Sequence, residues 1–312
     1  MSSDATSDPV GRAVEVLRRG GLVGLPTETV YGLAADATNE IAVRRVFAVK
    51  GRPADHPVIV HVADAAAAWQ WAATCPPAAA LLADACWPGP LTLLVPRADH
   101  VLDVVTGGRP TVGLRVPAQP MALDLLRRFG GGVAAPSANR FGHVSPTTAA
   151  HVRADLGDDV DLVLDGGACP VGVESTIVDC TVDPPQILRP GAIDDEQVAR
   201  LLEGLGGLAA ASGPSRASGM LASHYAPDAT VELFESPAAA TVRADSLAAE
   251  GVLVDVLDTT GDLVAAAQQL YAWLRDADDR GIEVVCAILP PPIGLGHAIR
   301  DRLQKAAALG PS

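Results

Sequence analysis

Positive charge is scarce in this sequence. Among its 312 residues, 23 lysines and arginines face 37 aspartates and glutamates, so the formal net charge at pH 7 is −14. Proteins that bind RNA or DNA tightly and without sequence preference use many lysines and arginines, which displace counterions from the phosphates. We therefore expect no stable nucleic-acid binding, whereas a local cationic pocket for a small anion is compatible with this composition.

Cysteine pairs and long apolar runs are absent from the sequence. The 5 cysteines are widely spaced and form no C-x-x-C pair, so neither a disulfide framework nor a protein-held metal site is predicted. There is no run of roughly 18 apolar residues for a membrane span, and the first residues, MSSDATSDPV, lack the basic and apolar regions of a secretion signal. We expect a cytoplasmic protein without a membrane segment.

Aromatic residues are also few, at 4%, while hydrophobic residues reach 49% and charged residues only 19%. These values exclude a disordered chain and predict cores made of alanine, valine and leucine. The chain is longer than the roughly 250–300 residues at which a single core stops growing. Two globular domains are therefore expected.

Polar side chains gather at the carboxyl end of the first predicted strand. The apolar run Leu22–Leu25 stops at Pro26, and a polar loop follows up to Gly32, where glycine allows a turn. The polar residues of this loop are Thr27, Glu28, Thr29 and Tyr31.

A lysine and an arginine flank the end of the next predicted helix. Asn39 is a typical N-cap and Gly51 a typical left-handed stop. Between them, apolar residues expected to face a core recur at helical spacing: Ile41, Val43, Val46, Phe47 and Val49. Lys50 and Arg52 either complement the helix dipole or hold an anion, and their spacing leaves both explanations open.

Two further segments could hold an anion. In the predicted strand 111–116, Thr111, Gly113 and Arg115 share one face, which suits a carboxylate or a phosphate; an edge strand with a solvated face is the alternative. Ser145 followed by Pro146 predicts a helix start whose free N–H groups suit a phosphate, although capping alone would explain the serine.

Familiar nucleotide and hydrolase motifs are missing. The sequence contains no G-x-x-x-x-G-K-[ST], H-E-x-x-H or G-x-S-x-G. The glycines of the segment 130–135 have dinucleotide-loop spacing but lead into a strand, which is the wrong order for that motif. His61 lies in an apolar run, where a hydrogen-bonded core histidine is the usual explanation.

The composition changes near residue 206. The segment 206–227 is rich in glycine, alanine, serine and proline, carries no acidic residue and ends in His224-Tyr225-Ala226-Pro227, which predicts a linker. Strands and helices alternate beyond it, which predicts a small Rossmann-like parallel α/β sheet. We expect domains at 1–205 and 229–312, joined by a linker at 206–228.

Six motifs in one order resemble the L-threonylcarbamoyladenylate synthase family over roughly residues 10–205. They are PTETVYGL at 26–33, KGRP at 50–53, TVGLRVP at 111–117, APSAN at 135–139 with SPT at 145–147, ESTIVD at 174–179 and RPGAI at 189–193. The HYAP segment at 224–227 and IRDRLQKAA at 299–307 are similar to the two-domain branch rather than to single-domain YrdC-like proteins. The resemblance implies an open twisted mixed sheet with helices around a concave site in the first domain.

The resemblance also implies an activity. Members of the family are nucleotidyltransferases that make threonylcarbamoyl-AMP and pyrophosphate from L-threonine, bicarbonate and ATP, with Mg²⁺ accompanying the ATP. The product serves threonylcarbamoylation of adenosine 37 in tRNA by a downstream transferase complex. Positioning and charge neutralisation would carry such catalysis, since three anions must be gathered in one site.

Carried over position by position, the resemblance implies two sets of site residues. The expected L-threonine contacts are Thr29, His61, Arg115, Ala135 and Ser175. The expected nucleotide contacts are Lys50, Arg52, His56, Thr111, Ser137, Asn139, Ser145, Arg189, His224 and Tyr225. Lys50 and Arg52 are expected to be catalytic, by neutralising the departing pyrophosphate, and the linker is expected to act as a lid that brings His224 and Tyr225 to the nucleotide.

Two departures and three other functions are weighed against this assignment. The family pattern commonly has asparagine at position 56 and Pro-Gly where Ser218-Gly219 stands here. A carbamoyl-adenylate-forming enzyme of the hydrogenase-maturation type would carry additional zinc-finger-like and transferase regions. An RNA-binding module would need more positive charge, and a regulatory threonine or nucleotide sensor would release no pyrophosphate.

Overall fold

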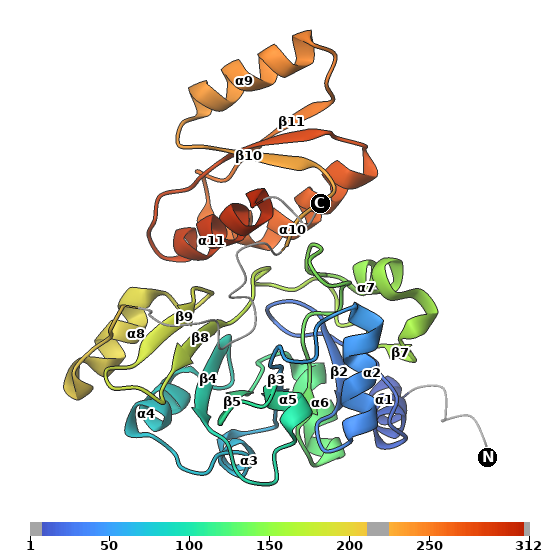
Figure 1. Cartoon of the computed structure of the whole chain (residues 1–312), viewed down its shortest axis with the longest axis vertical. Helices are drawn as coiled ribbons and strands as arrows, with labels where there is room; N and C mark the ends of the chain where they lie inside the picture. Colours follow the sequence, from blue (N-terminus) through green and yellow to red (C-terminus); the bar gives the residue numbers. More distant parts are fainter. Residues whose placement is uncertain (1–7, 211–224, 309–312) are drawn as a thin grey trace.

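Two separate sheets organise the chain in the computed structural model, which describes residues 8–210 and 225–308 (Figure 1). In the described residues, the larger sheet has nine strands in the order β7-β1-β2-β6-β3-β5-β4-β8-β9. The sheet contains both parallel and antiparallel pairs of neighbouring strands, so the predicted mixed α/β sheet is confirmed. Its strands are β1 (Val23–Leu25), β2 (Gly32–Asp36), β3 (Ile59–His61), β4 (Leu91–Pro96), β5 (Thr111–Arg115), β6 (Val133–Ala134), β7 (Leu162–Val163), β8 (Thr176–Asp179) and β9 (Gln186–Arg189).

Helices cover both faces of this sheet. Helices α1 and α6 pack on one face of β1, β2 and β6, whereas α2 and α7 pack on the other, so that successive residues of β2 enter different cores. Helices α4 and α8 enclose a third core over β4 and β5. The helices are α1 (Pro9–Arg18), α2 (Glu40–Lys50), α3 (Ala65–Trp69), α4 (Pro77–Cys86), α5 (Asp103–Thr106), α6 (Pro120–Phe129), α7 (Ala149–Leu156) and α8 (Asp195–Leu202), with 3₁₀ turns at Gly157–Asp159 and Glu203–Leu205.

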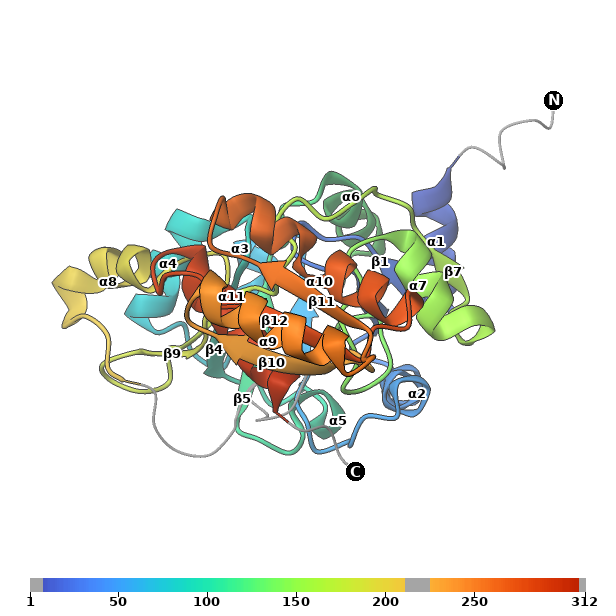
Figure 2. The same cartoon turned by 90° about the horizontal axis from the view of Figure 1, so that it is seen from above.

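The second body is a small parallel sheet, as predicted. Strand β12 (Val284–Ile288) lies between β10 (Thr230–Phe234) and β11 (Val254–Asp258). Helix α9 (Pro237–Ala249) covers its outer face, while α10 (Leu263–Asp279) and α11 (Leu295–Ala307) lie between this sheet and the large body (Figure 1). Figure 2 shows, from above, that the small body lies over the middle of the large one.

An apolar cluster joins the two bodies. Val30, Val144 and Val173 of the large body pack in one buried cluster with residues of α10 and α11, including Tyr271 and Leu303. The bodies therefore share a hydrophobic contact in addition to the chain that links them.

Three local expectations were wrong, each because tertiary contacts outweigh a local pattern. Gly32 begins strand β2 instead of making a turn, since its neighbours pair with β1. Helix α7 begins after Thr148, whose side chain caps it, whereas Ser145 binds another part of the chain. Ile41 is 81% exposed although the helix around it has the predicted bounds.

Three further observations bear on the sequence expectations. Strand β5 lies between β3 and β4, so it is not an edge strand. All five cysteines lie in the described ranges and are free, with only Cys75 exposed. Of the helices that the structure describes, none is long and apolar enough to cross a membrane.

The left-handed end of α2 makes a stability prediction. Gly51 has φ 65°, and a Cβ atom there would meet nothing within 4 Å. Gly51→Ala should therefore lower the free energy of unfolding by about 1 kcal/mol through backbone conformation alone, as measured by urea denaturation. Gly204→Ala is the matched control, because its Cβ is equally uncrowded and its φ is not positive; equal effects of both changes would contradict this explanation.

Candidate active site

A cavity lies where several strand ends of the large sheet meet. Its walls come from the loop after β1, the ends of β3, β5 and β9, the segment after β6 and the segment before β8. The lining residues are Thr27, Thr29, Val30, Gly32, Arg52, Ile59, His61, Arg115, Ala135, Pro136, Ser137, Glu174, Ser175, Arg189 and Tyr225. All five positions expected to contact L-threonine are among them.

Arg115 is held in place by a buried carboxylate. Its Nη2 donates to Oε1 of Glu28 at 2.7 Å and its Nε donates to the carbonyl oxygen of Gly89 at 3.3 Å. The second oxygen of Glu28 accepts from the backbone N–H of Ala118 at 3.0 Å, which fixes the carboxylate. In the described residues no partner is found for Nη1 of Arg115, so one edge of the guanidinium is available to a ligand carboxylate.

Glu28 was not predicted as a site residue. The sequence shows it as a polar residue in the loop that precedes β2, and nothing local distinguishes it from Thr27 beside it. The signal that would have identified it is a need for charge balance, because an arginine only 4% exposed requires a partner.

His61 is a neutral hydrogen-bonding group in the cavity wall. Burial, reinforced by the nearby charge of Arg115, lowers the pKa of His61 to about 3. Its Nδ1 is buried without a partner in the part of the chain that the structure describes. A buried polar atom without a partner is costly, so a ligand that hydrogen-bonds this nitrogen would gain affinity.

Two further guanidinium groups line the cavity. Nη2 of Arg52 donates to the carbonyl oxygen of Pro57 at 3.0 Å, and burial lowers the pKa of Arg52 to about 10, which leaves it charged at neutral pH. Arg189 donates from Nε and Nη2 to the carbonyl oxygen of Ser175, at 3.0 and 2.8 Å. Together with Arg115, these groups make a cavity suited to anions.

Glu174 is the carboxylate in the cavity lining, and three donors occupy it. Ser145 Oγ donates to Oε1 at 2.6 Å, while Tyr271 OH and Arg302 Nε both donate to Oε2 at 2.8 Å. Burial would raise the pKa of Glu174, but the charges of Arg302 and Arg189 outweigh it and lower the pKa to about 2. Tyr271 and Arg302 belong to α10 and α11, so only the fold brings them here.

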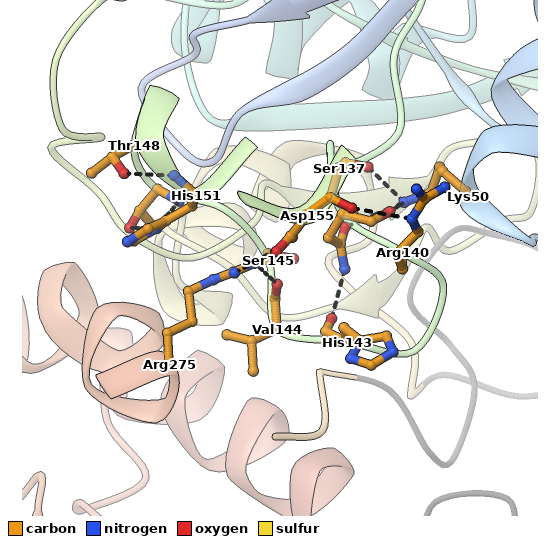
Figure 3. Close-up of polar contacts among 12 residues, drawn as sticks. Lys50, Ser137, Arg140, His143, Val144, Ser145, Thr148, His151, Asp155 and Arg275 are labelled. Atoms are coloured by element: carbon orange, nitrogen blue, oxygen red, sulfur yellow. Dashed lines mark hydrogen bonds and ion pairs between the residues drawn. The ribbon is translucent and has the colours of Figure 1, made fainter. Parts of the chain in front are cut away.

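Lys50 does not line the cavity but holds a loop that does. Its Nζ donates to the carbonyl oxygens of Ser137 and Asn139, both at 2.6 Å, and to Oδ1 of Asn139 at 3.2 Å (Figure 3). Nδ2 of Asn139 in turn donates to the carbonyl oxygen of His143 at 2.6 Å. Burial lowers the pKa of Lys50 well below its usual range, and the amine holds the loop that carries Ser137.

The remaining expected nucleotide positions lie around the cavity or away from it. His56 packs against Phe141, with ring centroids 5.7 Å apart. Thr111 begins β5 at the end opposite Arg115, where it pairs with Pro96. His224 lies outside the described residues, whereas its neighbour Tyr225 is buried in the cavity wall.

The cavity does not offer a protein-held site for Mg²⁺. Mg²⁺ prefers carboxylate oxygens and water, and the two oxygens of Glu174 are already occupied by Ser145, Tyr271 and Arg302. Within the described ranges, no group of three or more histidine, cysteine, aspartate or glutamate side chains could hold a metal ion. The donor set fits Mg²⁺ only as a companion of nucleotide phosphates.

Known proteins match this chain over nearly its whole length. Residues 15–191 match the family of Sua5, YciO and YrdC, described as telomere recombination, and residues 193–308 match the C-terminal domain of threonylcarbamoyl-AMP synthase. Threonylcarbamoyl-AMP synthase of Pyrococcus abyssi is 40% identical over 315 residues, covering 95% of this chain and 93% of that protein. The Bacillus subtilis enzyme of the same name is 38% identical over 326 residues, covering 97% and 94%.

A solved structure agrees equally well. The crystal structure of P. abyssi Sua5 complexed with L-threonine has a TM-score of 0.90 and 38% sequence identity, and the match covers 96% of this chain and 94% of that one.

The buried histidine makes a pH prediction. The pKa of His61 lies near 3 in the folded protein and near 6.5 when the chain is unfolded, so below pH 6.5 the unfolded state binds the extra proton. This histidine therefore makes stability fall as the pH decreases from about 6 toward 4, by about 1.4 kcal/mol per pH unit.

Urea denaturation of the wild type and of His61→Gln at pH 7, 6 and 5 checks it. The variant should lose less stability between pH 6 and 5 than the wild type loses. Equal losses, or a histidine ring that NMR shows to be protonated at pH 5, would contradict the neutral assignment.

Proposed function

The chain belongs to the Sua5/YrdC family, in the branch with a C-terminal Sua5 domain, and from this premise we propose how its cavity makes threonylcarbamoyl-AMP. The protein is a threonylcarbamoyl-AMP synthase, a nucleotidyltransferase. Its substrates are proposed to be L-threonine, bicarbonate and ATP. The observation that carries the proposal is a single cavity lined by three buried arginines, one of them held by Glu28 with an edge open to a ligand.

The amino-acid end of the cavity is assigned to Arg115 and its neighbours. The open edge of Arg115 would bind the carboxylate of L-threonine in a charge-assisted pair. Neutral His61 beside it would accept or donate one hydrogen bond without adding charge near the amine, which must be unprotonated to react. Thr29, Ala135 and Ser175 complete this wall.

The nucleotide end is assigned to Arg52, Arg189, Ser137 and Tyr225. The amine of threonine and bicarbonate form a carbamate with loss of water. A carbamate oxygen then attacks the α-phosphorus of ATP, and the bond from that phosphorus to the bridging oxygen breaks, releasing pyrophosphate. Arg52 and Arg189 would neutralise the charge of the triphosphate and of the departing pyrophosphate. No step requires a metal held by the protein, and Mg²⁺ would enter with ATP.

Lys50 has a different part in this proposal. A direct catalytic role would require its amine to leave the two carbonyl oxygens of Ser137 and Asn139. We assign it instead to holding the loop that presents Ser137. His56, Ser145, Asn139, Thr111 and His224 stay predictions as nucleotide contacts.

The domain division stays a proposal as well. A catalytic domain at 1–205 and a Rossmann-like domain at 229–312 are consistent with the two sheets. The lid expected at 206–228 stays a prediction, because residues 211–224 lie outside the described ranges. A cytoplasmic location and a downstream transferase that consumes the product for tRNA also stay predictions.

The three other functions are less well supported. The relatives that match nearly the full length of the chain are threonylcarbamoyl-AMP synthases rather than carbamoyl-adenylate-forming enzymes. The cations of the cavity are buried, which does not suit an RNA surface. An assay with ATP, bicarbonate and L-threonine, measuring threonylcarbamoyl-AMP and pyrophosphate together, tests the proposal against a sensor. Pyrophosphate release that does not depend on threonine would contradict it.

Arg115 makes the first prediction on the substrates. Since Arg115 and Glu28 balance each other, the double variant Arg115→Gln/Glu28→Gln removes the ligand-binding group without leaving a buried charge. We expect L-threonine affinity to fall about 30-fold or more, the effect of losing a buried charge pair worth at least about 2 kcal/mol. Calorimetry should show nearly unchanged ATP affinity, and an equal loss for both ligands would remove Arg115 from the amino-acid site.

Arg52 and Lys50 make the second prediction. Arg52→Gln should keep the unfolding temperature and raise the KM for ATP about tenfold, as expected for one lost charge-assisted contact.

Lys50→Met leaves the carbonyl groups of Ser137 and Asn139 without their donor, so it should lower the free energy of unfolding by about 2 kcal/mol or more. A Lys50→Met protein of wild-type stability that releases no pyrophosphate would instead show a direct catalytic role.

A further inference from the structure

The small body contributes two of the three groups that hold Glu174. Tyr271 of α10 and Arg302 of α11 both donate to Oε2 of Glu174 at 2.8 Å, while Ser145 of the large body donates to Oε1. Glu174 lines the cavity, but Tyr271 and Arg302 do not. The two side chains therefore reach the site only through residues that they hold.

Arg302 contacts three parts of the nucleotide end at once. Its side chain is completely buried, and Nη1 donates to the carbonyl oxygen of Pro190 at 3.0 Å, directly after Arg189. Its guanidinium carbon lies 5.3 Å from the centre of the Tyr225 ring. Glu174, the end of β9 and Tyr225 are thus all fixed by one planar group.

Tyr225 depends on the same cluster. Its backbone has φ 64°, a left-handed conformation that a non-glycine residue adopts rarely and that surrounding contacts must hold. The ring stacks on Tyr271 with centroids 5.8 Å apart, and Arg302 lies against it.

We propose that Arg302 and Tyr271 are positioning residues for the nucleotide half of the reaction, through Glu174, Tyr225 and the end of β9. The C-terminal body then forms part of the active-site wall instead of being only attached to it. The inference rests on the proposed function, because it assigns these residues to the ATP side of the cavity.

The contacts of Arg302 and Tyr271 are not needed merely to attach the small body to the large one. Arg275 of α10 binds both oxygens of Asp155 in α7, at 2.7 and 2.6 Å, and Nε2 of Gln268 donates to the carbonyl oxygen of Pro170 at 2.7 Å. The apolar cluster adds further contact between the bodies. A fully buried ion pair is a costly way to add adhesion, since both charges lose their water.

The charge of Glu174 depends on the same contact. Burial favours its protonated form, and the opposing charges come from Arg302 and Arg189; Ser145, Tyr225 and Tyr271 are the other groups around it. Loss of the positive charge of Arg302 would therefore raise the pKa of Glu174. The carboxylate would then become protonated at a higher pH than in the wild type.

Arg302→Lys, Tyr271→Phe and Asp155→Asn test the proposal. Arg302→Lys keeps the charge but replaces the two spaced donors, Nε to Glu174 and Nη1 to Pro190, with a single ammonium group. Tyr271→Phe removes one hydroxyl. Asp155→Asn is the control, because it breaks another ion pair between the bodies, which is partly buried, and leaves the cavity lining unchanged. KM values for ATP and threonine and kcat are measured for each variant below its unfolding temperature, and ATP affinity is measured by calorimetry.

The expected pattern separates ATP from threonine. Arg302→Lys should raise the KM and the Kd for ATP about tenfold, in line with the loss of one charge-assisted hydrogen bond. Tyr271→Phe should raise both about threefold, because Glu174 keeps its other donors. The KM for threonine should stay within about twofold, and Asp155→Asn should change neither KM by more than that. Arg302→Met should in addition move the acid limb of kcat/KM for ATP to higher pH.

Three outcomes decide the question. Unchanged ATP parameters in folded Arg302→Lys and Tyr271→Phe overturn the inference, and so does an equal change in Asp155→Asn, which would indicate adhesion alone. A wild type that binds ATP but releases no threonine-dependent pyrophosphate contradicts the proposed function, while the calorimetric comparison of the variants still decides the role of Arg302.

Discussion

The rest of the site depends on an excess of buried positive charge. Around one cavity, four buried arginines, Arg52, Arg115, Arg189 and Arg302, face two buried carboxylates, Glu28 and Glu174. Each of these carboxylates is engaged with an arginine, and Arg302 also pairs with Asp301 at 2.6 Å. An anion that enters the cavity therefore meets several buried guanidinium groups at once. A cavity with such an excess favours ligands that carry several negative charges, and its occupation stabilises the folded protein in turn.

The fold orients these charges with backbone groups as well as with acids. Carbonyl oxygens of Gly89, Pro57, Ser175 and Pro190 accept from the four guanidinium groups, and two more carbonyl oxygens accept from Lys50. Neutral acceptors fix the direction of a cation without cancelling its charge. Segments that flank strands suit this purpose, because their carbonyl groups are not all used by the sheet. The site is therefore preorganised for charge that develops on phosphate oxygens.

Local signals in the sequence predicted local structure well. Helix α2 begins after Asn39 and ends at Gly51 as expected, since caps depend on a few adjacent residues. The motif residues around Thr29, Arg115 and Ser175 were found because the resemblance covers them. Ser145 was misassigned because a serine before a proline has the same local pattern whether it caps a helix or binds a distant carboxylate. Glu28 and its partner Arg115 are 87 residues apart in sequence, and Glu174 and its partner Arg302 are 128 apart. Hydrophobic periodicity, which reports local structure, cannot predict such distant pairs.

The charge distribution also explains how an acidic protein can handle highly anionic substrates. The formal net charge is −14, yet the arginines that line the cavity are buried and lie together. At physiological ionic strength, interactions between exposed charges are screened beyond about 8 Å, whereas buried charges are screened far less. A small anion that enters the cavity therefore meets the arginines directly, while a nucleic acid at the surface meets mostly carboxylates. The cavity can therefore attract a small anion although the surface repels a nucleic acid, because the two kinds of phosphate meet different parts of the molecule.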